Sequence, residues 1–407
     1  MAQICPGQPV LLISSLCSEE RYRTVVSLRK KASLDPSQRL FSAVVEGLKD
    51  NHCDVTCISF EPFSANNTDL KEIPRSEEKL DGVKYIYVGF RTDPVHRMLD
   101  IYRHTRQEAL RWHKETGAGR KTIICDSLRF MASLPVRRFG KRQHIPTVAF
   151  VTDYPLLATS IKGKQGRLKS LFQNAFDRLA SRDLRKYDTY IAVADGLREL
   201  IRPGEKPYLV IEDIIRVNGI AYEEREEKET FTFLYGGALC ERFGVNKLVS
   251  AFQRIDCANV RLELYGSGES VPFIEASAQK DDRIVYGGVL PFEELMQKQK
   301  QADILVNPRP SDEVFSKYSF PSKTLSYMVS GTPVLSTRIP GIPADYEPYL
   351  YWFDAEDESA MAKRMEELTR QKKSELQNKG RAALEYAVRN KNPLVQCRKI
   401  VNFISAL

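Results

Sequence analysis

The stretch that decides the fold runs from Asn307 to Val334 and reads NPRPSDEVFSKYSFPSKTLSYMVSGTPV. An uninterrupted apolar run at 304–306 comes directly before it, and such a run is typical of a central parallel strand that is covered on both faces. Pro321 and Gly331 bracket a helix that we expect to begin at about Ser322. The stretch therefore predicts a strand, a polar loop and a helix.

The loop between this strand and this helix has the composition of an anion site. Ser319, Ser322 and Lys323 would converge with the free N–H groups of the first helical turn, where the helix dipole favours negative charge. A diphosphate is the natural ligand. The alternative is an ordinary strand-to-helix turn, in which Ser322 only caps the helix and Lys323 is only solvated.

A second segment, Thr232 to Phe252, repeats the pattern as TFLYGGALCERFGVNKLVSAF. Its apolar strand ends in the glycine pair Gly236 and Gly237, and Arg242 follows before an amphipathic helix. We therefore expect a second phosphate-facing loop here.

Two further strands end in glycines, LELYGSG at 262–268 with Gly266 and RIVYGGV at 283–289 with Tyr286. Strand–glycine–helix units occur in α/β domains without any ligand. Together, however, the four predicted parallel strands carry Gly, Ser, Arg or Lys at their carboxyl ends, which is the edge at which open α/β sheets bind ligands.

The motifs LYGGAL, ERFGV, ELYGSGE, RIVYGG, ADILVNPRP, YSFPSK and SGTPV, in this order and spacing, resemble the donor-binding half of family-4 retaining glycosyltransferases of the GT-B fold. The resemblance is greatest to the bacterial branch that builds surface polysaccharides. It covers residues 228–350 strongly and extends weakly to 35–48 and 148–155. It implies an α/β chain of two Rossmann-like domains facing a cleft, and transfer of a hexose from a nucleotide diphosphate donor, UDP- or GDP-linked, with retention of configuration.

The resemblance also implies a set of site residues. Those expected to bind the donor are Gly236, Gly237, Lys247, Gly266, Tyr286, Ser319, Ser322 and Ser326. Ser326 stands where family members carry the second of two glutamates, which holds the donor ribose, and Tyr318 stands eight residues earlier. A serine at 326 can still donate one hydrogen bond to a ribose, without the charge-assisted strength of a carboxylate.

Catalysis by a retaining transferase chiefly requires stabilisation of the leaving diphosphate. Arg242, Lys247 and Lys323 are the candidates for that role. Asp153, in VTDYP at the end of a first-half strand, is the candidate that orients or deprotonates the acceptor hydroxyl. Its alternative role is to cap the turn before Pro155.

The expected domains are an acceptor-side domain at 1–205, a linker at 206–229, a donor-binding domain at 230–385 and a terminal helix at 386–407 that returns to the first domain. The length of 407 residues suits two domains with sizeable cores. In the first half, Ser18 to Lys31 is charged and lacks a glycine pair, so we expect either a mobile lid over the acceptor or a disordered insertion.

Composition argues against a membrane-spanning, a disulfide-bonded or a zinc-binding protein. The sequence has no apolar run of membrane-spanning length, and its start, MAQICPGQPVLLISSLC, is expected to form the first strand of a cytoplasmic protein. The eight cysteines include no CxxC pair, so we expect neither a zinc site nor disulfides, and no cofactor besides the nucleotide sugar.

The net charge of +8 is concentrated in two places. Residues 161–186 interleave basic and apolar residues at helical spacing, and 137–142 reads RRFGKR. One interpretation is peripheral attachment to an anionic surface at the inner membrane face. The other is a helix that buries its apolar face in its own core. No recognition motif accompanies the charge, so nucleic acid is not expected as a partner.

Three functions remain open from sequence. The first is a glycosyltransferase acting on a lipid-linked or glycan acceptor. The second is a glycosyltransferase-like subunit that binds without catalysis, which the serine at 326 suggests. The third is an epimerase of the same fold, although its usual histidine in the second domain is absent, because all five histidines lie in the first half.

Overall fold

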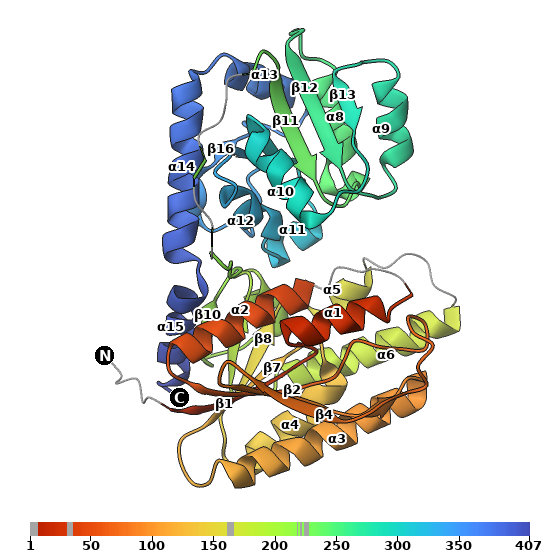
Figure 1. Cartoon of the computed structure of the whole chain (residues 1–407), viewed down its shortest axis with the longest axis vertical. Coiled ribbons are helices and arrows are strands. Elements are labelled where there is room, and N and C mark those ends of the chain that lie inside the picture. The colour runs from red at the N-terminus through yellow and green to blue at the C-terminus, as the bar shows by residue number, and fades with distance from the viewer. Residues whose placement is uncertain (1–6, 31–35, 161–166, 218, 220–221, 224–227) are drawn as a thin grey trace. The chain divides into compact units, whose positions relative to one another are not determined.

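The computed structural model of this protein describes residues 7–30, 36–160, 167–217, 219, 222–223 and 228–407. The chain forms two compact units (Figure 1). Unit 1 comprises Met1–Arg216 and Asn392–Leu407, and unit 2 comprises Val217–Lys391. Each unit is built around one mainly parallel sheet with helices packed on it.

Unit 1 contains an eight-stranded sheet in the order β10-β9-β8-β7-β1-β2-β5-β4, parallel except for β4. The strands are β1 (Pro9–Ser14), β2 (Asp54–Ser59), β4 (Ser76–Leu80), β5 (Val83–Tyr87), β7 (Thr122–Asp126), β8 (Thr147–Val151), β9 (Thr189–Ala192) and β10 (Tyr208–Val210). A separate antiparallel pair is formed by β3 (Glu72–Ile73) and β6 (Phe90–Arg91). Strands β1, β7 and β8 are almost wholly buried, as expected for uninterrupted apolar runs.

The order in which the chain adds strands to the unit 1 sheet reverses at one point. From β1 it steps through β2 to β5 on one side, and from β7 it steps through β8 and β9 to β10 on the other. The reversal lies between the neighbouring strands β1 and β7. Open α/β sheets bind ligands at such a switch point, outside the carboxyl ends of the strands.

The helices of unit 1 are α1 (Glu19–Ser27), α2 (Pro36–Asp50), α3 (Pro94–Glu115), α4 (Phe130–Arg142), α5 (Pro155–Ser160), α6 (Arg167–Leu184), α7 (Leu197–Ile201) and α15 (Pro393–Ile404). Helices α3 and α4 pack together, and α15 packs on α2 (Figure 1). A Cβ on Gly47 of α2 would come within 2.3 Å of the Pro393 carbonyl oxygen, so glycine permits this close approach. The Asn51 amide donates to the Leu394 carbonyl across the same contact, at 2.9 Å.

The segment expected to be a lid or a disordered insertion contains a helix, so its interpretation as disordered is wrong. The Ser18 side chain accepts a hydrogen bond from the Arg21 N–H, and two glutamates occupy the first turn of α1. Such a cap and such charges stabilise a helix start. Val25 is buried, and Arg21 forms an ion pair with the buried Glu61.

The basic cluster at 137–142 is only partly exposed. Arg137 is 4% exposed and its guanidinium is paired with Asp183, at 2.5 Å for the shorter contact. The predicted contribution of Arg137 to a membrane-facing cluster is therefore wrong. Arg138, Lys141 and Arg142 are exposed. Of the basic segment at 161–186, residues 161–166 lie outside the described residues.

Unit 2 contains a six-stranded parallel sheet in the order β13-β12-β11-β14-β15-β16. The strands are β11 (Phe231–Gly236), β12 (Val260–Tyr265), β13 (Ile284–Tyr286), β14 (Ile304–Asn307), β15 (Val334–Ser336) and β16 (Tyr351–Trp352). The chain steps from β11 to β13 on one side and from β14 to β16 on the other, so the switch point lies between β11 and β14.

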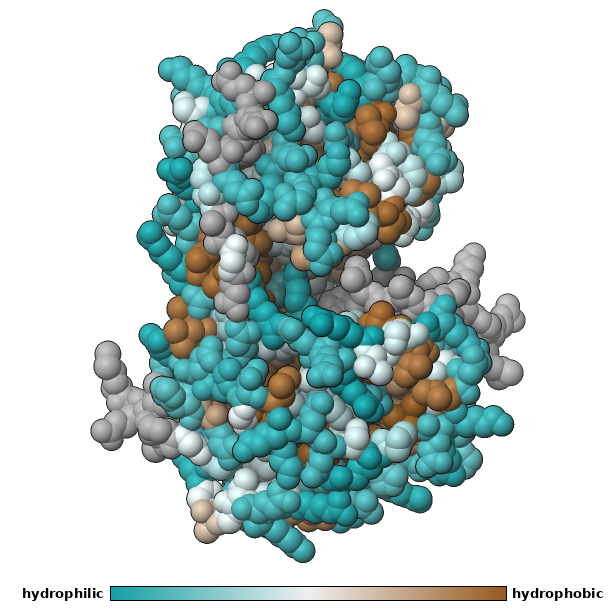
Figure 2. All heavy atoms as spheres, in the orientation of Figure 1, coloured by the Kyte–Doolittle hydropathy of each residue, from teal (hydrophilic) through white to brown (hydrophobic). Residues whose placement is uncertain are grey.

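The helices of unit 2 are η1 (Glu241–Phe243), α8 (Val245–Phe252), α9 (Val271–Ala278), α10 (Phe292–Gln301), α11 (Val314–Tyr318), α12 (Ser322–Met328), η2 (Ala344–Tyr349), α13 (Glu358–Thr369) and α14 (Lys373–Asn390). Helix α13 packs on α8, and α14 packs on α12. The core lies between the sheet and α8, where Phe233, Val249 and Phe252 are fully buried. Figure 2 shows hydrophilic residues over most of the visible face, with small hydrophobic patches among them.

Candidate functional site

The glycine-rich loops of unit 2 are joined to one another at the carboxyl ends of their strands. The Gly237 N–H donates to the Tyr265 carbonyl at 2.8 Å, and the Gly266 N–H donates to the Gly288 carbonyl at 2.7 Å. The Tyr286 hydroxyl donates to the Gly266 carbonyl at 3.0 Å. A Cβ on Gly266 would come within 1.8 Å of the Gly237 carbonyl oxygen, and Gly266 has a φ of +133°. Only glycine allows the loops to approach this closely.

Lys323, in the first turn of α12, lies against the end of β11. Its Nζ donates to the Tyr235 hydroxyl at 2.5 Å and lies 3.8 Å from the centre of the Tyr235 ring. The Tyr235 hydroxyl in turn donates to the Ala238 carbonyl at 2.8 Å. A Cβ on Gly237 would come within 2.3 Å of Lys323 Nζ, so the second glycine of the pair makes room for the ammonium group.

The Lys323 ammonium holds its proton weakly. The pKa of Lys323 is lowered from 10.5 to about 7, mainly by burial; Cys240 opposes this shift and the positive charge of Arg309 adds to it. An anion that binds beside a desolvated lysine favours its charged form again. Strongly perturbed groups of this kind are concentrated at functional sites.

Arg309, which sequence reasoning did not select, organises the loop after β14. Its Nε donates to the Ser316 hydroxyl at 3.0 Å, and its Nη2 donates to the Ser319 hydroxyl at 2.6 Å. The Ser319 hydroxyl donates onward to the Phe315 carbonyl at 2.8 Å. In this structure Ser319 therefore orders the loop around Arg309. The only signal in the sequence was an arginine two residues beyond a buried strand.

Arg242 is connected to the same loop through aromatic rings. Its guanidinium lies 4.9 Å from the ring centre of Phe243, which meets the ring of Phe315 edge-on at 5.8 Å. Arg309 covers the Phe315 ring at 4.3 Å. Next in the chain, Gly244 has a φ of +79°, and a Cβ there would come within 1.9 Å of the Pro308 carbonyl oxygen. The loops after β11 and β14, which flank the switch point, thus pack on each other.

Helix α12 is fixed to β11 by Tyr327, a second residue that sequence reasoning did not select. The Tyr327 hydroxyl accepts from the Gly236 N–H at 2.9 Å and donates to the Gly236 carbonyl at 3.1 Å. Of the predicted donor residues nearby, Ser322 is exposed at the start of α12, Ser326 is partly exposed one turn later, and Lys247 is partly exposed on α8.

Asp153, the predicted acceptor residue, belongs to unit 1 and follows β8. Its carboxylate accepts a hydrogen bond from the Tyr154 N–H at 2.8 Å, directly before α5. The residue two positions on is Pro155, which has no N–H, so this contact is not the two-residue Asx cap, and the Asp153 side chain is partly exposed.

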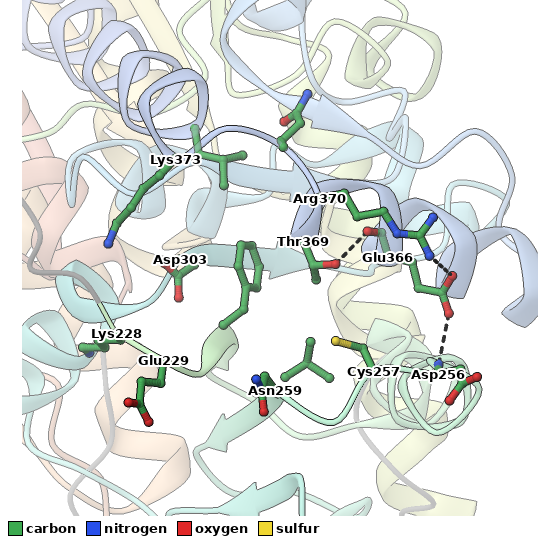
Figure 3. Close-up of a pocket in the computed structure, with 14 residues that line it drawn as sticks. Lys228, Glu229, Asp256, Cys257, Asn259, Asp303, Glu366, Thr369, Arg370 and Lys373 are labelled. Atoms are coloured by element: carbon green, nitrogen blue, oxygen red, sulfur yellow. Dashed lines mark hydrogen bonds and ion pairs between the residues drawn. The ribbon is translucent and has the colours of Figure 1, made fainter.

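A pocket of about 450 Å³ lies at the amino-terminal ends of the unit 2 strands, opposite the glycine loops (Figure 3). Its lining includes Phe231, Val260 and Asp303, which stand at the amino-terminal ends of β11, β12 and β14. In Figure 3, Arg370 lies beside Glu366, whose carboxylate accepts the Asp256 N–H at 3.0 Å. The glycine loops follow the carboxyl ends of the same strands, so this pocket is separate from the site around Lys323.

Neither a metal centre nor a membrane span is found in the part of the chain that the structure describes. Its histidines, cysteines and carboxylates form no group of three that could hold a metal ion. None of its helices combines the length and the apolar character needed to cross a bilayer.

The sequence of residues 230–371 matches the family model described as Glycosyl transferases group 1. None of the curated proteins compared matches the chain.

The whole chain is similar in structure to several solved proteins. Sucrose-phosphate synthase from Thermosynechococcus elongatus is 14% identical with a TM-score of 0.62, covering 97% of this chain and 98% of that one. A UDP-forming trehalose-phosphate synthase from Burkholderia xenovorans is 13% identical with a TM-score of 0.63, covering 98% of both chains. The lipopolysaccharide outer core galactosyltransferase WaaB is 15% identical with a TM-score of 0.59, covering 98% of this chain and 99% of that one.

These likenesses establish the fold, which is GT-B with two Rossmann-like domains, so the predicted fold class is confirmed. The predicted resemblance to glycosyltransferases is also confirmed. The family match and the fold together support a nucleotide-sugar glycosyltransferase.

Proposed function

We propose that this chain is a retaining glycosyltransferase that moves a hexose from a nucleotide diphosphate donor to a lipid-linked or glycan acceptor. One observation carries the proposal: the Lys323 ammonium is buried against the glycine pair at the switch point of unit 2. A buried cation without a carboxylate in hydrogen-bond contact costs stability, and a donor diphosphate beside it would supply the missing negative charge. Residues 230–371, which match the family model, include this site.

In the proposed reaction, the bond between the sugar C1 and the diphosphate oxygen breaks and the diphosphate leaves with the electron pair. Lys323 and Arg242 stabilise the charge that develops on it. The acceptor hydroxyl attacks C1 from the face that the diphosphate leaves, and Asp153 orients that hydroxyl or takes its proton. Configuration at C1 is thereby retained.

We further propose a role in surface polysaccharide synthesis at the cytoplasmic face of a membrane. The support is helix α6, on which Leu171 and Leu179 are 66% and 55% exposed. Arg178 and Arg182 on the same helix are also exposed. Exposed leucines beside arginines are typical of a helix that lies on an anionic lipid surface.

The test is donor binding and turnover. We expect at least one of the UDP, GDP or ADP sugars to raise the melting temperature of the full chain and to be hydrolysed slowly to free sugar and nucleoside diphosphate. Lys323→Met should lose both responses. If no donor binds the unaltered chain, the proposed function is wrong.

A non-catalytic glycosyltransferase-like subunit is the second candidate. It is favoured by Ser326, which stands on α12 where family members carry the ribose-binding glutamate. Donor binding without hydrolysis or transfer would support this candidate. Release of a nucleotide sugar with altered stereochemistry would instead indicate an epimerase.

A further inference from the structure

Two arginines from different helices stand near the carboxyl ends of the unit 1 strands. Arg97 lies in the first turn of α3, and Arg129 stands directly before α4. Arg129 follows β7 by three residues, and Arg97 contacts the segment that follows β2. Both side chains therefore belong to the carboxyl edge of the sheet, where this class of fold binds ligands.

Arg97 is held without an acidic partner. Its Nε donates to the Phe63 carbonyl at 2.8 Å, and its guanidinium lies 5.4 Å and 5.5 Å from the ring centres of Phe60 and Phe90. Among the described residues, no carboxylate forms an ion pair with it. The pKa of Arg97 is lowered to about 10, mainly by burial and in part by the positive charge of Arg129. Arg97 remains charged at neutral pH.

Arg129 is better compensated but still accessible. Its Nε lies 3.3 Å from Oδ2 of the fully buried Asp126, and its Nη2 donates to the Ser37 hydroxyl at 3.4 Å. The side chain is 27% exposed. The charge of Arg129 is therefore compensated by Asp126, whereas no carboxylate among the described residues pairs with Arg97.

Buried hydroxyl groups line the ends of the strands on either side of the switch point. Ser15 after β1 is 3% exposed and Ser127 after β7 is 7% exposed. Neither hydroxyl forms a hydrogen bond within the described part of the chain. Ser133 on α4 is a contrast, because its buried hydroxyl donates to the Asp126 carbonyl at 2.8 Å. Buried hydroxyls normally have partners, so the fold leaves hydrogen-bonding capacity unused at this edge.

We infer that unit 1 binds a phosphate group between Arg97 and Arg129. A phosphate fits this site better than a carboxylate, because its oxygens can accept from two guanidinium groups and from a hydroxyl at once. The two arginines are pre-positioned by the Phe63 carbonyl and by Asp126, so little side-chain entropy is lost on binding. The inference that a phosphate binds here is independent of the proposed function. The assignment of that phosphate to the acceptor rests on the proposed function.

The experiment uses the full chain with Lys323→Met as background, so that phosphate bound in unit 2 does not contribute. The probes are inorganic phosphate, glucose 6-phosphate and a short isoprenyl diphosphate, measured by titration calorimetry. We expect at least one probe to bind, and Arg97→Met to weaken it at least tenfold. Arg97→Lys should show an intermediate loss, because it keeps the charge and loses the forked donor geometry. Tighter binding of the sugar phosphate indicates a soluble acceptor, and tighter binding of the isoprenyl diphosphate indicates a lipid-linked one.

The matched control is Arg137→Met. Arg137 is a buried arginine on the neighbouring α4, but it is fully paired with Asp183. Its replacement should lower the melting temperature and leave probe binding unchanged. The opposite holds for Arg97→Met, which removes an uncompensated charge and should not destabilise the chain. If no probe binds, or if Arg97→Met destabilises the chain without weakening binding, Arg97 is only a packing residue and the inference is overturned. Donor binding measured without the Lys323→Met background tests the proposed function separately.

Discussion

The proton equilibrium of Lys323 gives a quantitative test of the proposed donor site. Burial lowers its pKa from 10.5 to about 7. Between these two values the unfolded chain carries a proton on Lys323 that the folded chain has lost, so stability should rise with pH from 7 to 10.5. The penalty of burying the charge is fully present below pH 7. At 1.36 kcal/mol per pKa unit it amounts to about 5 kcal/mol for complete burial, and the partial exposure of the side chain reduces it to about 2–3 kcal/mol.

Lys323→Met removes this penalty. We expect the variant to be about 2–3 kcal/mol more stable than the unaltered chain at pH 6, with the difference vanishing as the pH approaches 10. Denaturant unfolding at pH 6 and pH 10 measures both values. A variant that is less stable at pH 6 would show that the hydrogen bond to Tyr235 outweighs the desolvation of the charge.

The same equilibrium predicts that the donor takes up a proton when it binds. At pH 8 most of Lys323 is neutral in the free protein, and a diphosphate beside it restores the charged form, so most of one proton should be absorbed per donor bound. A nucleotide sugar has no group of its own that titrates near this pH. Its affinity should therefore fall by up to tenfold for each pH unit above 7.

Titration calorimetry at pH 8 in two buffers with different ionisation enthalpies measures the uptake directly. The observed binding enthalpies should differ between the buffers for the unaltered chain. They should agree at pH 6, where Lys323 is already protonated, and they should agree for Lys323→Met at any pH. Tight donor binding with no proton uptake at pH 8 would refute the contact between Lys323 and the diphosphate.

Three further predictions concern neighbouring features. Gly237→Ala should weaken donor binding at least tenfold, because its Cβ would come within 2.3 Å of Lys323 Nζ. Gly288 also has a positive φ, of +72° against +142° for Gly237, but has open space around it, so Gly288→Ala should cost only stability; calorimetry and melting temperature separate the two effects. Ser326→Glu should be tolerated on the partly exposed face of α12 and should strengthen donor binding through the ribose hydroxyls, and a lower melting temperature with no gain in affinity would favour the non-catalytic candidate. Binding to anionic vesicles should be lost at high salt, and at low salt it should weaken by about 3 kcal/mol when glutamine replaces all of Arg138, Lys141 and Arg142; equal binding to neutral vesicles would contradict this account.

The sheets could be predicted largely because their central strands are buried on both faces. The uninterrupted apolar run at 304–306 gives β14 within a residue of its observed bounds. The edge strand β4 (SEEKL) is mostly exposed and charged, so it carries no apolar pattern from which it could be recognised. Helix α1 was missed because it buries only Val25 and depends on a cap and an ion pair instead.

Some residues of the candidate site could likewise be predicted from the sequence, and others could not. Lys323 and the glycine pair could be selected because strand-to-loop-to-helix patterns mark them. Tyr235 could not, because as the last side chain of an apolar strand it looks like an ordinary core residue. Its role depends on a contact with Lys323, 88 positions later in the chain. Arg97 lies in a helix rich in basic residues, which is the usual pattern of a solvated surface, and only the contacts with aromatic rings distinguish it from its neighbours.

Lys323 and Arg97 present the same physical problem in separate units. Each is a cation placed at the carboxyl edge of a parallel sheet, next to a second cation and without a carboxylate in an ion pair within the described residues. The buried Arg137, by contrast, is paired with Asp183. Folding alone would favour a carboxylate or an apolar side chain at both positions, because an unpaired buried charge is destabilising. The cost is recovered only when an anion binds. A transferase whose donor carries a diphosphate and whose acceptor carries a phosphate would therefore be stabilised at both positions by its own substrates, and each substrate should raise its melting temperature independently of the other.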